Sequence, residues 1–505
     1  MNSLSKSRFL SGCQCEKKPF FDIYRKDLKP PIPEAKQAVF DTGHAIGALA
    51  QKLYPGGRDA NEGIDRDWKT SIIRTKQWLA EGIQTIYEAT FSIPGGFAAL
   101  DILHHQNGER WAIEVKSSGS IKPYYITDAS FQYFVMKQAG YTPDKIFLMY
   151  IDKSLTKNGE IDPEGLFKLE DITQQVIDNQ SAIKAKHALL LSMLSSENEP
   201  SRDIGKHSKD PFECDYMHHC WSHLSKNNIL EVYSHKEKGW ELYQQGIHSI
   251  TDIPEDAFNN ARQLVQITGI KSNTLQIDHQ SIKEFMSSFT APLYFFDFET
   301  INPTLPVLDG THPFQQVPFQ YSLHITDLKG QIIEHREFLA EPEDFHSPSK
   351  IDPRRKLLDQ LKKDISAGGT IIAYYSSFEV SRLNELAEAF PEDREFIESL
   401  IGRMKDLLVP FKSGWYYDPK MGGSNSIKYV LPAIAPEYSY KDLEISNGSD
   451  ASSIFLSMVL EIFQGDITKT QKNLLEYCKR DSEGMVVIYK HLRSVCNNSG
   501  TKESF

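Results

Sequence analysis

The sequence predicts an α/β protein with more than one domain. Strands are indicated by apolar or alternating runs, such as LYFFDFE (293–299) and the pair FAALDILHHQ and ERWAIEVK (97–116). Helices are indicated by apolar residues three and four apart, as in DPRRKLLDQLKKDIS (352–366). Because such segments alternate along 505 residues, we expect two or three domains, each with its own core.

The composition is that of an ordinary globular chain, with 40% hydrophobic and 25% charged residues. The start, MNSLSKSRFLSGCQC, lacks the apolar core of a secretory signal, and no run approaches the roughly 18 apolar residues of a spanning helix. We therefore expect a soluble, cytoplasmic protein without a membrane partner.

The formal net charge of −12 argues against a basic surface that coats nucleic acid, but it leaves room for a local basic channel. Basic residues near the start could line such a channel or simply be solvated: Lys6, Arg8, Lys17, Lys18, Arg25, Lys26 and Lys29.

The first expected domain covers residues 1–225. A helix entered near Gly43 and His44 ends at a Pro-Gly-Gly turn, and a second runs from about Arg66 to Glu81. Two strands then meet at a turn spanning Gln106–Gly108.

This hairpin carries three charged residues. Asp101 lies at the end of the first strand, and Glu114 and Lys116 lie two apart on the second, so they share a face. Twelve residues separate Asp101 from the Glu114-Val115-Lys116 string, which is the spacing of a PD-(D/E)xK nuclease core. A surface hairpin with alternating charge would read the same way.

His44, after a glycine on the upstream helix, and Gln132, on a helix beyond the hairpin, extend the pattern. Together these residues resemble the RecB-like family, which includes the CRISPR-associated iron-sulfur nucleases and the AddB nuclease domain. The resemblance implies a restriction-endonuclease-like fold, a metal ion bound by His44, Asp101 and Glu114, and catalytic roles for Lys116 and Gln132. Without it, a single histidine on a helix is more often an ordinary helix residue.

Cysteines bracket this domain. In the RecB-like family one cysteine before the core and three after it, spaced CxxCxxxxxC, bind a four-iron cluster. Cys214 and Cys220 match the last two, Pro211 stands where the other downstream cysteine is usual, and Cys15 and Cys13 would complete the set. Thiolates suit a [4Fe-4S] cluster or zinc, for which His218 or His219 would be a further ligand. A site without metal is the third alternative, and Cys478 and Cys496 are expected to be ordinary thiols.

Residues 226–288 are expected to form a helical connector. Two helical stretches flank a Gly-Ile turn at residues 246 and 247. This arrangement resembles the helix-hairpin-helix connectors that bind phosphates through backbone amides, and it also fits a plain helical linker.

The last expected domain covers residues 289–495 and is followed by a frayed tail, 496–505. Asp297 and Glu299 share one face at the end of a strand. Tyr477 and Asp481 are four apart and share a helix face. Oxygen ligands of this kind suit hard cations such as Mg²⁺ or Mn²⁺. Taken singly, each pair could be no more than a strand end and a helix face.

These pairs match the DxE and YxxxD motifs of the DEDD exonucleases. Between them, IIAYYSSFEVSRLNEL resembles the second motif, with Tyr375 where Asn is usual and Glu379 where Asp is usual. The domain thus resembles the DnaQ-like superfamily, and the strings DPKMGG and GGSNSIKYVLPAI are similar to an uncharacterised bacterial family that carries such a domain.

The resemblance implies a ribonuclease H-like mixed sheet and Mg²⁺ or Mn²⁺ ions held by Asp297, Glu299, Glu379 and Asp481. Tyr477 would orient the attacking water or help to deprotonate it. Asp406 is expected to be structural, and the aromatic loop SGWYYDPKMGGSNS would either stack on a nucleotide or form an ordered surface loop.

The sequence therefore predicts a metal-dependent nuclease that acts on nucleic acid. Processing of DNA ends in repair or defence, with 3'-5' exonuclease activity from the last domain, is favoured by the resemblance. An RNA-processing exonuclease would use the same carboxylates. A non-catalytic nucleic-acid-binding scaffold is the other alternative, because Tyr375, Glu379 and Pro211 depart from their motifs. Protein partners are not indicated.

Overall fold

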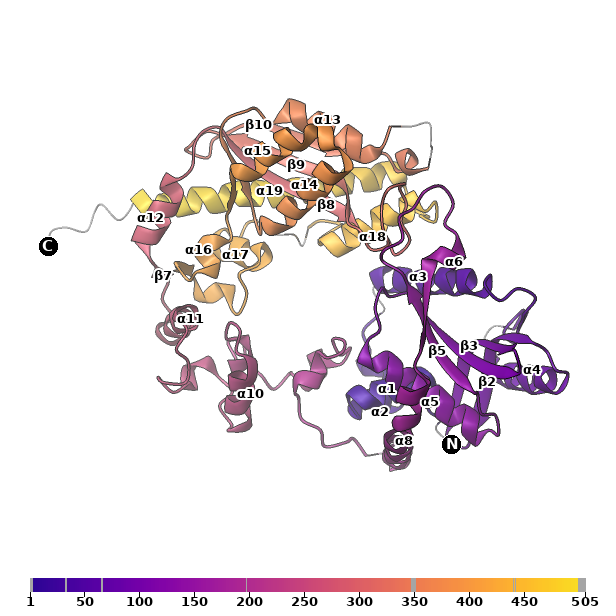
Figure 1. Ribbon diagram of the computed structural model, residues 1–505. Helices are drawn as coiled ribbons and strands as arrows, with labels where there is room; N and C mark the ends of the chain where they lie inside the picture. Colours follow the sequence, from indigo (N-terminus) through magenta and orange to yellow (C-terminus); the bar gives the residue numbers. More distant parts are fainter. Residues whose placement is uncertain are drawn as a thin grey trace. The chain divides into compact units, whose positions relative to one another are not determined.

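The computed structural model describes residues 3–31, 34–64, 67–196, 198–346, 351–438, 440 and 442–497. The chain divides into two compact units (Figure 1). Unit 1 is Met1–His223 with Thr304–Phe314, and unit 2 is Leu224–Pro303 with Gln315–Phe505. The expected connector, residues 226–288, is part of unit 2. Within the described ranges, no helix is long and apolar enough to cross a membrane.

Unit 1 contains a six-stranded mixed sheet with the order β1-β2-β3-β4-β5-β6. The middle strands β2, β3 and β4 are antiparallel, and β5 runs parallel to β4. The strands are β1 Arg58–Asp59, β2 Thr85–Ile93, β3 Gly96–Gln106, β4 Glu109–Lys116, β5 Lys145–Ile151 and β6 Phe167–Asp171.

Alternation along these strands gives unit 1 a core on each face of its sheet. Ala112 of β4 packs in the cluster that includes Phe131 of α5. Ile113, the next residue, packs with Ala50 of α3 on the other face. The helices are α1 Lys6–Gln14, α2 Lys17–Tyr24, α3 Glu34–Gln51, α4 Trp68–Ala80, α5 Pro123–Gln138, α6 Pro163–Leu166, α7 Thr173–Asp178, α8 Gln180–Ser195 and α9 Met217–Cys220.

Two expected helix starts differ from the structure. Helix α3 begins at Glu34, so Gly43 and His44 lie within it rather than at its entry. Helix α4 begins at Trp68 after an Asp67 N-cap, and Arg66 lies outside the described residues. The hairpin turn is where the sequence indicates it, because Asn107 and Gly108 both adopt positive φ, as a two-residue turn requires.

Unit 2 contains a five-stranded mixed sheet with the order β10-β9-β8-β11-β12. Strands β8, β9 and β10 are antiparallel, whereas β11 and β12 run parallel to β8. The strands are β8 Leu293–Ile301, β9 Val317–Thr326, β10 Ile332–Leu339, β11 Thr370–Ala373 and β12 Met404–Asp406. The predicted α/β class is confirmed for both units.

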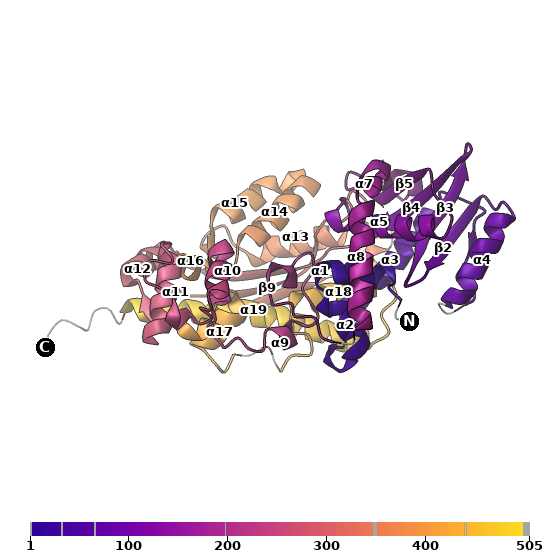
Figure 2. The ribbon, with the colours of Figure 1, turned by 90° about the horizontal axis from the view of Figure 1, so that it is seen from below.

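Helices cover both faces of this sheet, so β8 and β9 are buried almost throughout. Helices α13, α14 and α15 lie on one face and α19 on the other (Figure 2). The helices of unit 2 are α10 Lys236–Gln244, α11 Ala261–Ser272, α12 His279–Ser287, α13 Pro353–Asp364, α14 Ser377–Ala389, α15 Arg394–Gly402, α16 Val409–Lys412, α17 Ile427–Ile434, α18 Gly448–Val459 and α19 Ile467–Asn497.

The two tyrosines of the aromatic loop are buried and do not form an open stacking platform. Tyr416 and Tyr417 form β13 (Tyr416–Tyr417), which pairs with β7 (Gln276–Ile277), and each is 2% exposed. The expected Gly-Ile turn follows α10, where Gly246 has positive φ. Of the expected tail, residues 498–505 lie outside the described residues.

Candidate active sites

Strand β8 directs two carboxylates to one face of the unit 2 sheet. Phe296 and Phe298 pack in the core with α13–α15, so Asp297 and Glu299 point to the opposite face. Phe295 shares that opposite face and packs against Tyr489 of α19, with ring centroids 5.5 Å apart. Helix α19 therefore covers the face that carries the acidic pair.

Helix α19 brings three polar side chains to this face. Tyr477 is 3% exposed, and Asp481, one turn later, accepts a hydrogen bond from the Tyr440 hydroxyl at 2.5 Å. The Cys478 thiol lies 3.7 Å from Asp297 Oδ2. Asp297, Glu299 and Cys478 offer ligand atoms within 4.8 Å of one another, and no other group of three or more His, Cys, Asp or Glu does so in the described part of the chain.

The fourth predicted carboxylate comes from the first turn of α14. Glu379 is 2% exposed, and its Oε2 atom is buried without a hydrogen-bond partner. The helix start is fixed by Asp406, whose Oδ1 accepts the backbone N–H of Tyr375 at 2.9 Å and that of Leu408 at 3.0 Å. Asp406 thus has the structural role that was expected for it.

All four carboxylates and Tyr477 line one cavity of about 440 Å³. Its other lining residues include Thr300, Asn302, Gln316, Tyr374, Tyr375, Ile427, Lys428, Gly448, Ser449 and Ser452. A Cβ atom on Gly448 would lie 3.5 Å from Glu299 Oε2 and 3.8 Å from the Tyr477 hydroxyl. The glycine therefore keeps one wall of the cavity open.

Lys428 is a cation in this cavity that the sequence did not single out. Its ammonium group donates to the Ser446 carbonyl at 2.9 Å and lies 5.5 Å from the Tyr440 ring and 5.7 Å from the Tyr477 ring. The residue is one lysine in an otherwise apolar helix, IKYVLPAI, and nothing in its spacing marks it as a site residue.

Burial and mutual repulsion raise the pKa values of the acidic groups. Burial, then Asp481, raises the pKa of Glu299 to about 8, with Lys428 acting in the opposite direction. Burial, and then Asp406, raises the pKa of Glu379 to about 8. Burial and the neighbouring carboxylates also hold the pKa of Asp297 well above its usual range. Buried, mutually repelling carboxylates and the unpartnered Glu379 Oε2 fit a divalent cation with oxygen ligands.

Part of this region is similar to a known domain family. Residues 294–426 match a domain of unknown function, DUF2779. The matched segment includes Asp297, Glu299 and Glu379, and it ends before Tyr477 and Asp481.

Similar proteins are known from mycoplasmas. The uncharacterized protein MG366 of Mycoplasma genitalium is 24% identical over 53% of this chain and 41% of its own length. The uncharacterized protein UU173 of Ureaplasma parvum is 23% identical over 46% of this chain and 35% of its own. The MG366 homolog of Mycoplasma pneumoniae is 26% identical over 40% of this chain. The chain thus covers between 32% and 41% of the length of these relatives.

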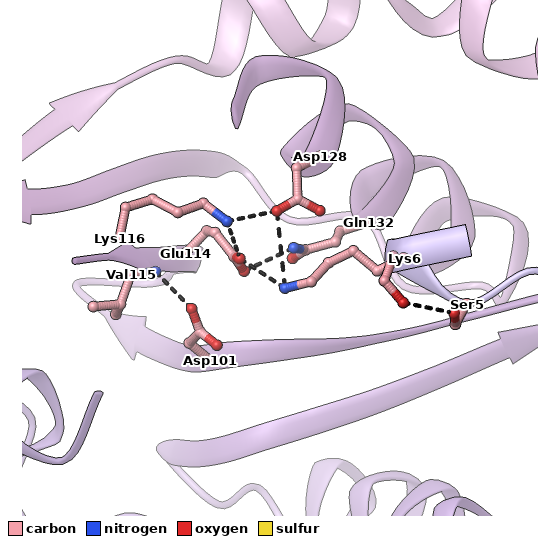
Figure 3. Close-up of polar contacts among 9 residues, drawn as sticks. Ser5, Lys6, Asp101, Glu114, Val115, Lys116, Asp128 and Gln132 are labelled. Carbon is pink, nitrogen blue, oxygen red and sulfur yellow. Dashed lines mark hydrogen bonds and ion pairs between the residues drawn. The ribbon is translucent and has the colours of Figure 1, made fainter. Parts of the chain in front are cut away.

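Unit 1 holds a second polar cluster, centred on Glu114 (Figure 3). Ile102 pairs with Ile113 across β3 and β4, so Asp101 and Glu114 are the next residues beyond this pair. Glu114 is 2% exposed; its Oε1 accepts from Lys116 at 2.7 Å, and its Oε2 accepts from Gln132 at 2.7 Å. The Asp101 carboxylate accepts the Val115 N–H at 2.6 Å.

Two further charged residues complete this cluster. The Lys6 ammonium of α1 lies 2.7 Å from Glu114 Oε1 and 3.9 Å from Asp128 Oδ2. Asp128, one turn before Gln132 on α5, accepts from Lys116 at 2.5 Å. Burial acts against ionisation of Glu114, but Lys116 and Lys6 outweigh it and hold the pKa of Glu114 well below its usual range. Lys116 and Lys6 therefore pair with Glu114 and Asp128. Burial, and then Glu114, raises the pKa of Asp101 well above its usual range.

The structure thus brings together Asp101, Glu114, Lys116 and Gln132 and adds Lys6 and Asp128. His44, the remaining predicted ligand, is exposed on α3. Asp128 could have been suspected, because it lies four residues before Gln132 and so shares its helix face. The sequence marks Lys6 only as one of several basic residues near the start, and its partner Glu114 is 108 residues away.

Three of the four predicted cluster cysteines line one cavity. Cys15, Cys214 and Cys220 do so, whereas Cys13 is exposed and lines a neighbouring cavity together with Pro211. Burial raises the pKa of Cys214 and of Cys220. The pocket thus offers three thiols rather than the four of a four-iron cluster, and cluster, zinc and no metal remain open predictions.

Hydrogen bonds also hold this region together. The Gln14 amide donates to the His207 carbonyl at 2.8 Å and to the Phe212 carbonyl at 2.6 Å, while Lys18 donates to Gln14 at 2.8 Å. The N-terminal helices are therefore tied to the end of unit 1 by hydrogen bonds.

Proposed function

We propose that the chain is a metal-dependent nuclease that hydrolyses phosphodiester bonds of nucleic acid, with 3'-5' exonuclease activity in unit 2. The observation that carries this proposal is the convergence of Asp297, Glu299, Glu379 and Asp481, from three separate elements, on one cavity with Tyr477. The order of the sheet, three antiparallel strands followed by two parallel ones, supports a ribonuclease H-like fold.

In this proposal the protein groups have separate tasks. Divalent ions, when bound, supply charge neutralisation for the phosphate and lower the pKa of water. Burial, then Asp481, raises the pKa of Tyr477 well above its usual range, so its hydroxyl keeps its proton. In the metal-free protein it can therefore orient water by a hydrogen bond. Lys428 is the cation on the cavity wall that can face a phosphate oxygen.

Unit 1 supports a second proposal, that of a RecB-like site that processes DNA ends. Asp101, Glu114 and Lys116 are the acidic pair and lysine that such chemistry needs. One observation favours a role without cleavage: both lysines donate to Glu114 Oε1, an oxygen that a metal ion would otherwise use. A non-catalytic scaffold is therefore the alternative for this unit.

The test is a nuclease assay on end-labelled single-stranded DNA and matched RNA with Mg²⁺ or Mn²⁺. Asp297→Asn and Lys116→Met each remove one charge from one site. Glu388→Gln, on an exposed position of α14, serves as the control for unit 2. Label at the 5' or the 3' end reports the polarity of digestion.

We expect Asp297→Asn to abolish shortening from the 3' end while Glu388→Gln retains it. Loss of cleavage only in Lys116→Met would assign the activity to unit 1 instead. Cleavage of RNA but not DNA would favour the RNA-processing alternative. Binding without shortening in the wild type, with either metal, would leave the scaffold as the function.

A further inference from the structure

We infer that Cys478 is a metal ligand alongside Asp297 and Glu299, and that this set selects a borderline transition-metal ion such as Zn²⁺ or Co²⁺ over Mg²⁺. The inference concerns two of the carboxylates that line the acidic cavity of the proposed function, Asp297 and Glu299, with the Cys478 thiol beside Asp297. It deepens that function by naming the class of metal, and it requires binding only, not cleavage.

The geometry places the thiol beside two of the four carboxylates. Asp297, Glu299 and Cys478 offer ligand atoms within 4.8 Å of one another. The sulfur lies 3.7 Å from Asp297 Oδ2, and Cys478 is fully buried. It follows Tyr477 directly on α19, so the helix that carries Tyr477 and Asp481 also fixes the thiol against β8.

A second observation points to a ligand in this cavity. Glu379 is 2% exposed and lines the same cavity, yet its Oε2 has no hydrogen-bond partner. A buried carboxylate oxygen without a donor is costly unless something supplies one or a cation takes its place. The cavity holds a single lysine among its lining residues, and that lysine donates to the Ser446 carbonyl.

The donor set decides which cation fits. Carboxylates alone suit Mg²⁺, which demands oxygen ligands and keeps much of its water. A thiolate is a soft ligand that favours zinc and its neighbours in the transition series. On binding, the thiol S–H bond breaks, a metal–sulfur bond forms, and the proton passes to the buffer. The oxidation state of the metal does not change.

Cobalt is the direct probe, because Co²⁺ bound to a thiolate gives a near-ultraviolet charge-transfer band. The full chain is titrated with Co²⁺ as wild type, Cys478→Ser, Cys478→Ala and Cys214→Ser. The last variant reports any cobalt bound by the cysteine pocket of unit 1. Competition by Zn²⁺ and by Mg²⁺ gives the selectivity, and circular dichroism shows that each variant is folded.

We expect both Cys478 variants to lose a band that Cys214→Ser retains. Their affinity for Zn²⁺ should fall by at least about tenfold, because even residues that only hydrogen-bond to a metal ligand usually cost that much when they are replaced. Their affinity for Mg²⁺ should not change. A band that persists in both variants, or disappears only in Cys214→Ser, overturns the inference.

The two proposals fail separately. If the protein shows a cobalt–thiolate band but never cleaves nucleic acid, the proposed nuclease function is wrong and the metal-site inference is retained. If Mg²⁺ supports cleavage that depends on Asp297 but no band depends on Cys478, the metal-ligand role of Cys478 is wrong and the nuclease proposal is retained.

Discussion

Loss of the Glu299 proton should make the metal-free protein less stable as pH rises. Its pKa is raised from the ordinary value of 4.5 to about 8, first by burial and then by Asp481. Between those two values the folded state holds a proton that the unfolded state has lost. The contribution of Glu299 to the free energy of unfolding is therefore complete below about pH 4.5 and is lost as pH rises toward 8.

The size of the effect follows from the interval between the two pKa values, 4.5 and about 8. Each pH unit corresponds to about 1.4 kcal/mol, so Glu299 costs the folded state up to roughly 4–5 kcal/mol by pH 8. The pKa of Glu379 is raised similarly, and Glu379 itself contributes to the shift of Glu299. The two contributions are coupled and do not add.

The substitution Glu299→Gln isolates this term, because glutamine keeps the shape of the neutral acid and cannot ionise. Urea unfolding with a chelator present should give similar stability for both proteins at pH 5. At pH 8 the variant should be the more stable one, by several kcal/mol. Adding Mn²⁺ at pH 8 should restore the wild type and leave the variant largely unchanged.

The control is Glu388→Gln, at an exposed position of the same unit, which should follow the wild type at both pH values. Parallel pH profiles for the wild type and Glu299→Gln would refute the reasoning. The reasoning would also be refuted if the stability of Glu299→Gln, relative to that of the wild type, were lowest at pH 8.

Three further substitutions test other parts of the structure. Lys6→Met removes an ammonium 2.7 Å from buried Glu114 and should cost about 1.5–3 kcal/mol in urea unfolding with a chelator, a loss that Mn²⁺ should reduce. Tyr375, 56% exposed with φ of +71°, occupies the left-handed region, so Tyr375→Asn should stabilise the protein by roughly 1 kcal/mol in the same assay. Gly448→Val places a side chain at the cavity wall, with its Cβ 3.5 Å from Glu299 Oε2, and should lower metal-dependent cleavage about 100-fold. Gly402→Val is the control, because a Cβ there meets nothing within 4 Å, and it should leave cleavage unchanged.

Local periodicity was enough to predict how the carboxylates of unit 2 are presented. The i, i+2 spacing of Asp297 and Glu299 puts both on one face of β8, and the i, i+4 spacing of Tyr477 and Asp481 does the same on α19. The hairpin turn at Asn107 and Gly108 was equally readable, because its two residues tolerate positive φ.

Contacts between distant segments could not be read in this way. Lys6 reaches Glu114 across 108 residues, and no local pattern distinguishes it from the other basic residues near the start. The segment Thr304–Phe314 belongs to unit 1 although the residues on either side of it belong to unit 2, so a single boundary along the chain could not describe the units. Tyr416 and Tyr417 look like stacking residues in sequence, yet pairing with β7 buries them.

The two acidic clusters differ in how their charge is balanced, and this difference predicts which unit responds to metal. In unit 1 Glu114 accepts hydrogen bonds from two lysines and an amide, so both of its oxygens are already paired. In unit 2 four carboxylates line a cavity with one lysine. A cation entering unit 2 relieves repulsion, whereas one entering unit 1 must first displace an ammonium group. Divalent ions should therefore slow hydrogen exchange in β8 and α19 more than in β3 and β4, and equal protection of both pairs would contradict this account.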